Sequence, residues 1–375
     1  MSRSHVFMAV RLLLVTAGIA VVIFAVHWHD GVEVPAGESF AGMPAQPEAH
    51  HVAVAGAQYL DSGIWEVTLD SGQTAQVSEE FRPGILRMLA RAEGGLLLFG
   101  LLFVGCVHPL QATRWWLLMR ARGLTARWPR TLRLVYIGAF SNFMLPGTEG
   151  GDVVKAWGAA KGTDRRVDAV MSVVFDRITG LLGLAILAAV FSFALAESDL
   201  AQTVGAWTWV GLLIVFVAGI AGFAAMLRGW LRLPAVVAHF GGGLPGRLED
   251  ALRAYGRHGG TIAAATGVSV IVQLCLAAAA ACCAWSLGSD HSIWVLLAAM
   301  PVLFLAAAIP LTWQGVGVME ALGIALLAMP GLATVNQVVG TLLLYRVLEL
   351  SWALMGGLML LRGDIQLRSE SPSSG

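Results

Sequence analysis

Six long apolar segments constrain what this chain can fold into more than any other feature. They cover, approximately, Phe7–Val26, Gly94–Met119, Ala169–Ala196, Ala206–Leu227, Thr261–Leu287 and Asn336–Leu361. Each is long enough to cross a hydrocarbon layer of about 30 Å as a helix. Charged residues make up only 13% of the chain, against about 25% in a typical soluble domain. The sequence therefore predicts an all-α polytopic membrane protein with about six full transmembrane helices.

A shorter apolar segment in the first half of the chain is interrupted. The run from Leu134 to Leu145 would span only about 18 Å as a helix, which is roughly half a bilayer. The interruption contains Pro146, Gly147, Glu149, Gly150, Gly151 and Asp152. Irregular backbone and acidic groups occur at membrane depth where protein or a wet cavity surrounds them. We therefore predict a re-entrant pair of half-helices whose break marks a binding site.

A second interruption lies in the other half of the chain. The apolar run Ile293–Ile309 is broken and resumes over Ala321–Met329. The break contains Pro310, Gly315, Gly317 and Glu320. Counting spans places this second pair on the opposite side from the first. Two broken elements of opposite orientation predict an inverted repeat with halves at about 94–196 and 261–361.

Basic residues concentrate in alternate loops and set the predicted orientation. The three internal loops carry Arg120, Arg122, Arg127, Arg130, Arg133, Lys155, Lys161, Arg165, Arg166, Arg228, Arg232, Arg247, Arg253 and Arg257. The short loops on the other side carry Glu197, Asp199 and Asp290 and no basic residue. Because basic loops stay in the cytoplasm, both termini are predicted to be cytoplasmic.

The sequence divides into four regions. We interpret residues 1–26 as an uncleaved transmembrane anchor, since its apolar run exceeds a signal-peptide core of about 7–15 residues. Residues 27–92 form an external segment with a β-hairpin at Ile64–Leu69 and Gln73–Val77. An amphipathic helix at the membrane interface follows, with Phe81, Ile85, Met88 and Leu89 on its apolar face. Residues 93–361 are the main membrane domain, and 362–375 are a polar cytoplasmic tail.

The helices that follow the two breaks carry ionisable residues inside predicted spans. Asp176 and Arg177 lie on the first, where each is expected to pair with a different partner. Tyr345, Arg346 and Glu349 lie on the second at helical spacing. Two interpretations remain open for them, a structural lock between helices and direct contact with a substrate. Asp152 and Glu320 lie at the break points themselves, which favours a functional role.

Several functions are not indicated by the sequence. The formal net charge is zero, so no broad basic surface suggests nucleic-acid binding. The four cysteines all lie in predicted spans, and the histidine pairs of the external segment lack the framing ligands of a zinc site. No phosphate-binding P-loop or hydrolase motif occurs, so we expect neither direct ATP use, nor a cofactor, nor enzymatic activity.

Three motifs resemble a known family. They are Arg114-Trp-Trp-Leu-Leu-Met-Arg-Ala-Arg-Gly-Leu124, then Asn142-x-x-x-Pro146-Gly147-x-x-Gly150-Gly151-Asp152-x-x-Lys155, and then Asp176-Arg177-x-x-Gly180. The region Pro310–Glu320 and the pair Tyr345-Arg346 are similar to motifs of its second half. Together they resemble the flippase-like membrane family, which includes the transmembrane domain of lysylphosphatidylglycerol synthases of the multiple peptide resistance factor type.

The resemblance implies a lipid translocase in the inner membrane of a bacterium. Its substrate would be a phospholipid, an aminoacylated lipid or a polyprenyl phosphate, and a lipid-modifying enzyme is a candidate partner. The expected translocation residues are Asn142, Pro146, Gly147, Gly150, Gly151, Asp152, Lys155, Asp176, Arg177, Pro310, Gly315, Gly317, Glu320, Tyr345, Arg346 and Glu349. Two features depart from the full-length synthases. Only the short polar segment 362–375 follows Leu361, so we expect no soluble transferase domain, and the external hairpin is an insert. The alternatives are a scaffold for a lipid-modifying synthase and a membrane-embedded transferase acting on a lipid carrier.

Overall fold

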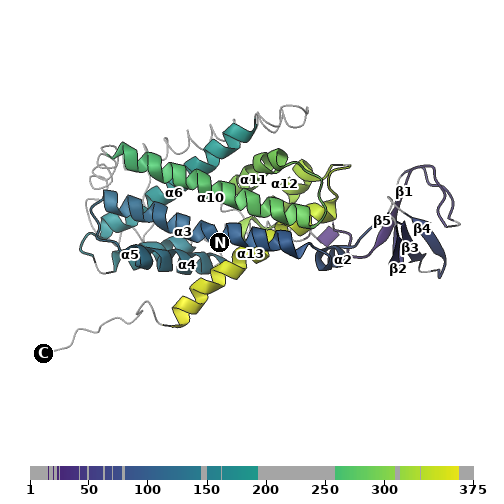
Figure 1. Ribbon diagram of the computed structural model, residues 1–375, viewed down its shortest axis with the longest axis horizontal. Coiled ribbons are helices and arrows are strands. Elements are labelled where there is room, and N and C mark those ends of the chain that lie inside the picture. The colour runs from purple at the N-terminus through teal and green to yellow at the C-terminus, as the bar shows by residue number, and fades with distance from the viewer. Residues whose placement is uncertain are drawn as a thin grey trace, which may run out of the picture.

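A computed structural model shows a helical membrane domain with a small β-sheet at one end (Figure 1). The structure describes residues 81–144, 150–161, 163–192, 258–308, 313–329 and 331–362. It also describes most of 26–77 and positions 16, 20, 23 and 24. Of the six predicted spans, 206–227 lies outside the described residues, as does most of 7–26.

The sheet has five antiparallel strands and is larger than the predicted hairpin. The strands are β1 (Gly31–Val34), β2 (His50–Asp61), β3 (Ile64–Leu69), β4 (Thr74–Val77) and β5 (Phe81–Arg82), in the order β4-β3-β2-β1-β5. Strands β3 and β4 form the predicted pair, and their turn contains Gly72 at a φ of 80°. Such a left-handed conformation suits glycine, which lacks a Cβ. The sequence predicts no strand before Ile64, whereas the structure has β1 and β2 there.

The predicted interfacial helix is shorter than expected and is buried against protein. Helix α2 covers only Ile85–Ala90, while Phe81 belongs to strand β5. Ile85 and Met88 pack with Leu287 and Val339 of the membrane domain. The apolar stripe is therefore real, but its partner is the protein rather than lipid.

The membrane domain repeats one order of helices. The first half contains α3 (Gly94–Ala121), α4 (Trp128–Met144), α5 (Gly150–Ala160) and α6 (Arg166–Ser192). The second contains α10 (Gly259–Ser286), α11 (Ile293–Ala308), α12 (Val318–Leu327) and α13 (Val335–Leu361). Each half is thus a long helix, two short helices separated by a break, and a second long helix.

Four of the described helices are long and apolar enough to cross a membrane. These are α3, α6, α10 and α13, at four of the six predicted places. Helix α4 is longer than the predicted half-helix, because it begins at Trp128 instead of Leu134. Its 17 residues would extend about 25 Å, still short of a full hydrocarbon layer. The basic residues Arg130 and Arg133 made its first turns look like loop.

The two halves run in opposite directions. The N–H of Glu93, which caps the start of α3, donates to the carbonyl of Ser286 at the end of α10 over 3.0 Å. Helices α3 and α10 are therefore antiparallel, and they pack along most of their length (Figure 1). The pair α4–α5 lies towards one end of the long helices and α11–α12 towards the other. Gly100 of α3 allows this close approach, because a Cβ there would lie 3.4 Å from the Ala279 carbonyl oxygen and the Cys282 Cβ of α10.

Candidate functional site

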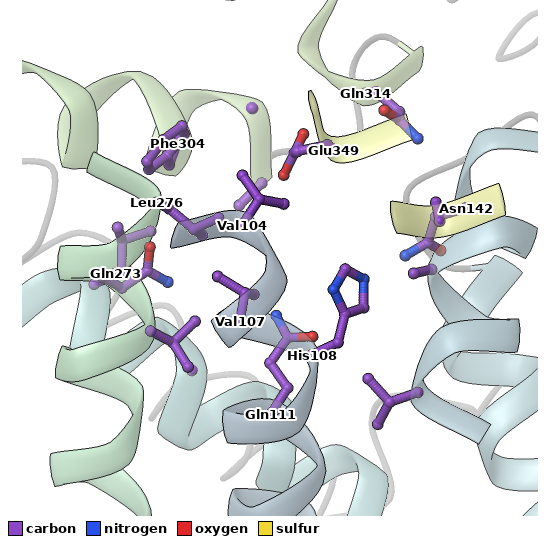
Figure 2. Close-up of a pocket in the computed structure, with 18 of the residues that line it drawn as sticks. Val104, Val107, His108, Gln111, Asn142, Gln273, Leu276, Phe304, Gln314 and Glu349 are labelled. Carbon is purple, nitrogen blue, oxygen red and sulfur yellow. The ribbon is translucent and has the colours of Figure 1, made fainter. Parts of the chain in front are cut away.

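A cavity of about 400 Å³ lies between the two halves of the membrane domain. Helices α3, α4, α5 and α6 contribute residues from one side, and α10, α11, α12 and α13 from the other. Figure 2 shows His108, Gln111, Asn142, Gln273, Gln314 and Glu349 around it. A polar cavity among apolar helices can solvate a group that lipid cannot.

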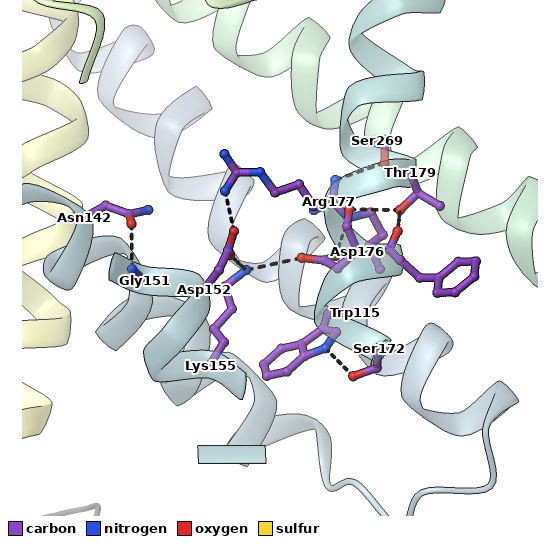
Figure 3. Close-up of polar contacts among 12 residues, drawn as sticks. Trp115, Asn142, Gly151, Asp152, Lys155, Ser172, Asp176, Arg177, Thr179 and Ser269 are labelled. Atoms are coloured by element: carbon purple, nitrogen blue, oxygen red, sulfur yellow. Dashed lines mark hydrogen bonds and ion pairs between the residues drawn. The ribbon is translucent and has the colours of Figure 1, made fainter. Parts of the chain in front are cut away.

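Asp176 forms ion pairs with two basic residues of the first half. Its Oδ1 accepts from Arg114 Nε at 2.7 Å, and its Oδ2 accepts from Lys155 Nζ at 3.2 Å (Figure 3). Arg114 also donates to Ser269 Oγ of α10 at 3.0 Å. The Asp176 side chain is only 4% exposed, so both of its oxygens are used by buried cations. This arrangement links α3, α5, α6 and α10.

Arg177 points to a different acid, as the sequence predicts. Its Nη1 lies 2.5 Å from Asp152 Oδ2, and Lys155 Nζ lies 3.1 Å from Asp152 Oδ1. The Arg177 side chain is 34% exposed and that of Asp152 is 25% exposed. Unlike Asp176, this pair is open to the cavity, which both of its members line.

The second half has a comparable pair. Arg346 Nη2 donates to Glu320 Oε1 at 2.9 Å, and Nη1 donates to the carbonyl of Gln314 at 3.0 Å. Glu320 Oε2 in turn accepts from the N–H of Gly317 at 2.6 Å. Gln314, Gly315 and Gly317 have φ values of 51°, 71° and 86°. Because of this left-handed turn, the Gln314 carbonyl and the Glu320 carboxylate both accept hydrogen bonds from the Arg346 guanidinium.

The two charge pairs occupy corresponding positions in the two halves. Asp152 is the third residue of α5 and Glu320 the third of α12. Arg177 and Arg346 are each the twelfth residue of the long helix that follows. The sequences around them are not visibly alike, so the correspondence becomes evident only from the helix boundaries.

Glu349 is the exception among these acids. Its Oε1 accepts from the hydroxyl of Tyr345 at 2.8 Å. Among the described residues, no cation lies within ion-pair distance of it, whereas Asp152, Asp176 and Glu320 each contact at least one. The corresponding position of α6, fifteenth in the helix, is Gly180, which faces the Arg114 guanidinium.

The cavity also contains polar atoms without partners in the described part of the chain. They are Nδ1 of His108, Oε1 of Gln273 and Nε of Arg346. The His108 ring stacks on Tyr136 with centroids 4.6 Å apart, which fixes its plane. Unpaired buried polar atoms are costly, so groups of this kind suit a polar ligand or water.

Gly151 at the first break serves helix packing. A Cβ on Gly151 would lie 2.2 Å from the carbonyl oxygen of Gly138, so α5 contacts the α4 backbone directly. Asn142 Oδ1 accepts from the Gly151 N–H at 2.7 Å and so satisfies the start of α5 (Figure 3). The Gly151 N–H is therefore not free to bind a ligand. Pro146, Gly147 and Pro310 lie outside the described residues.

Sequence reasoning missed several polar residues of the cavity. Arg114, His108 and Gln273 all lie within long apolar helices, and no break or repeat pointed to them. A polar side chain in the middle of a span was the available signal, because burying one in lipid is expensive. Among the described residues, no group of three or more histidine, cysteine or acidic side chains could hold a metal ion.

These features define a multi-pass α-helical membrane protein with a charged cavity between its halves. Residues 80–356 match the family described as the lysylphosphatidylglycerol synthase TM region, and the chain belongs to this family. The match confirms the resemblance that the sequence motifs indicate. Membership places the chain among membrane proteins of lipid metabolism or transport. No curated protein shows significant similarity to the chain.

Proposed function

We propose that the protein is a translocase that moves a phosphate-bearing lipid between leaflets without direct use of ATP. The observation that carries this proposal is the cavity between the halves, to which each half contributes an arginine, Arg177 or Arg346. Each arginine forms an ion pair with an acidic residue of a short helix, Asp152 or Glu320. Its volume of about 400 Å³ is typical of small-ligand sites. A lipid headgroup could enter it while the acyl chains remain among the surrounding lipids.

Arg177 is the residue best placed to receive the phosphate. Its pair with Asp152 is about one-third exposed, and such pairs contribute only about 0–1 kcal/mol. A phosphate oxygen can therefore replace the Asp152 carboxylate at small cost. Lys155, which contacts both Asp152 and Asp176, would keep Asp152 satisfied while Arg177 changes partner.

Arg346 would bind the phosphate at the other end of the path. It has an unpartnered Nε and a side chain that is only 16% exposed. In this proposal Asp176, Asn142 and the residues of the two breaks keep the half-helices in place, and Tyr345 and Glu349 line the route. The corresponding positions of the two pairs favour an inverted repeat, in which the short-helix pairs are re-entrant from opposite sides of a bacterial inner membrane.

The test is transport by purified protein in liposomes. Fluorescent phosphatidylglycerol, phosphatidylethanolamine and a short polyprenyl phosphate would serve as probes, with an impermeant quencher reporting the outer leaflet. We expect wild-type vesicles to exchange at least one probe faster than empty vesicles. Asp152→Ala and Glu320→Ala should each slow exchange several-fold, because each frees an arginine to hold phosphate too tightly.

Asp168→Asn is a matched control for the acidic substitutions. Asp168 pairs with Arg122 and Arg165 near the start of α6 and does not line the cavity. Exchange by this variant should equal that of the wild type. If wild-type vesicles exchange none of the three probes faster than empty vesicles, the translocase proposal is wrong.

A scaffold role is the second candidate, because the sheet has an exposed apolar end. Tyr59, Leu60 and Ile64 at the β2–β3 connection are 49%, 44% and 38% exposed. Aromatic and aliphatic groups of this kind are common at protein interfaces. Co-purification of a lipid-modifying enzyme that Tyr59→Ser abolishes, together with no transport by the protein alone, would favour this role.

A further inference from the structure

We infer that Glu349 binds the proton that accompanies the lipid through the cavity. This inference rests on the proposed translocase function and adds its coupling ion. The translocation path would then carry one anionic headgroup and one proton together.

Glu349 is a carboxyl group in the middle of a long membrane helix. It is the fifteenth residue of the 27 in α13, and the helix is apolar enough to cross a membrane. Tyr345, which is 3% exposed, is the one hydrogen-bond partner that Glu349 has among the described residues. A carboxylate at this depth without a cation is expensive, so the neutral, protonated acid is favoured when the cavity is empty of ligand.

The charges of the cavity depend on this one proton. Arg114, Lys155, Arg177 and Arg346 are cationic, and Asp152, Asp176, Glu320 and Glu349 are acidic. With Glu349 ionised the set is neutral, and with Glu349 protonated it carries one net positive charge. The protonated cavity therefore attracts an anionic headgroup, and loss of the proton favours its release.

Other titratable groups face Glu349 and its partner Tyr345. They are Arg346 on the same helix, Glu320 behind Arg346, His108 and Arg177 across the cavity, Tyr136 beneath His108 and Cys283 beside Tyr345. Arg177, Arg346 and Glu320 are ion-paired, so protonating or deprotonating them would break a pair. The carboxyl group of Glu349 can gain or lose a proton without breaking an ion pair.

The asymmetry of the repeat points to the second half as the proton site. At the eleventh and fifteenth positions, α6 has Asp176 and Gly180, while α13 has Tyr345 and Glu349. Asp176 is held by two cations, whereas Glu349 is held by a hydroxyl. The first half thus provides a buried carboxylate, Asp176, that two ion pairs hold in place. The second half provides Glu349, which can exchange a proton with the cavity.

The first measurement is the distribution of fluorescent phosphatidylglycerol in proteoliposomes with a pH gradient. For one proton per lipid, the probe should accumulate in the leaflet that faces the alkaline side, about tenfold for each pH unit. Any lipid exchange by Glu349→Gln should ignore the gradient, since its side chain is permanently neutral. Asp168→Asn should respond as the wild type does. A wild-type distribution that ignores the gradient, or a Glu349→Gln response equal to that of wild type, would overturn the coupling.

The second measurement does not require transport. Infrared spectroscopy of the detergent-purified protein should show the C=O stretch of a protonated carboxyl group at neutral pH. Glu349→Gln should remove this band and Asp168→Asn should retain it. Absence of the band in wild type overturns the proton site. If wild-type protein moves no lipid but shows the band, the translocase function and the coupling fail while the protonated Glu349 stands.

Discussion

At the scale of single residues, the membrane domain uses neighbouring charges for different purposes. Asp176 is buried between two cations, whereas the adjacent Arg177 is one-third exposed to the cavity. We expect Asp176→Asn to lower the free energy of unfolding by about 3–5 kcal/mol, since it leaves Arg114 buried without its acid. Arg177→Gln should cost at most about 1 kcal/mol but slow lipid exchange strongly. Thermal unfolding in detergent and liposome transport would separate them, and equal losses of stability would contradict the distinction.

Gly151 permits the contact between α4 and α5 that places Asp152 and Lys155. A methyl group there would lie 2.2 Å from the Gly138 carbonyl oxygen, so one helix must move. We expect Gly151→Ala to cost about 1–3 kcal/mol of stability and to reduce transport. Gly267→Ala on α10 is the matched control, because its Cβ would have no neighbour within 4 Å. A Gly151→Ala protein as stable and active as the control would refute this account of the break.

At the scale of elements, one side chain joins the sheet to the membrane domain. Asn336 at the start of α13 accepts from the His27 N–H at 2.9 Å and donates to the carbonyls of His27 and Pro83. We expect Asn336→Ala to speed hydrogen exchange at the His27 amide and through α2, because these three bonds are lost. Thr74→Ala on edge strand β4 should leave exchange there unchanged. Unaltered protection in Asn336→Ala would mean that the other contacts, namely the apolar packing of α2 and the ion pair of Arg87 with Asp30, hold the sheet.

The sheet should also lose stability in acid because of His51. Burial lowers the pKa of His51 below its ordinary value of 6.5; nearby His27 and Arg82 lower it further, and Glu33 opposes them. Asp290 faces the same space from the membrane domain. The unfolded sheet then binds a proton more tightly than the folded one, so stability falls as the pH drops below about 6.5. Hydrogen exchange in β1 and β2, corrected for intrinsic rates, should show this loss in wild type and less of it in His51→Gln.

The elements that sequence analysis predicted well are those with a strong period or composition. Helices α3, α6, α10 and α13 follow from length and apolarity, and β3 follows from alternation. Strand β2 was missed because its alanines and Gly56 dilute the alternating pattern. The apolar face of α2 was correctly identified but assigned to lipid, since periodicity cannot tell a membrane from the buried face of a protein.

At the scale of the whole molecule, the cavity depends on contacts that no local pattern contains. Arg114 reaches Asp176 across 62 residues and Ser269 across 155. The breaks indicated Asp152 and Glu320, and the cost of buried charge indicated Asp176, Arg177, Arg346 and Glu349. Which acid meets which cation depends on helix packing. The two cations on Asp176, and the lack of one on Glu349 among the described residues, are therefore visible only in the structure.

The antiparallel halves lead to a prediction about topology. The α3–α4 connection lies at the end of the long helices away from the sheet, while the α12–α13 connection lies near it (Figure 1). Single cysteines would replace two groups of residues. The first group, Thr125 and Thr163, lies at the end away from the sheet, and the second group, Gly72 and Leu332, lies in or near the sheet. The background would have Cys106, Cys275, Cys282 and Cys283 replaced, since Cys106 is itself exposed.

An impermeant thiol reagent applied to intact cells should label the second group alone. The basic residues around Thr125 and Thr163 predict that this end is cytoplasmic, and the sheet would then lie outside. Permeabilising the cells should make all four positions reactive, which controls for buried or unfolded sites. Labelling of Thr125 and Leu332 positions from the same side would contradict the opposite orientation of the two short-helix pairs. It would also remove the basis for a path in which Arg177 and Arg346 serve opposite leaflets.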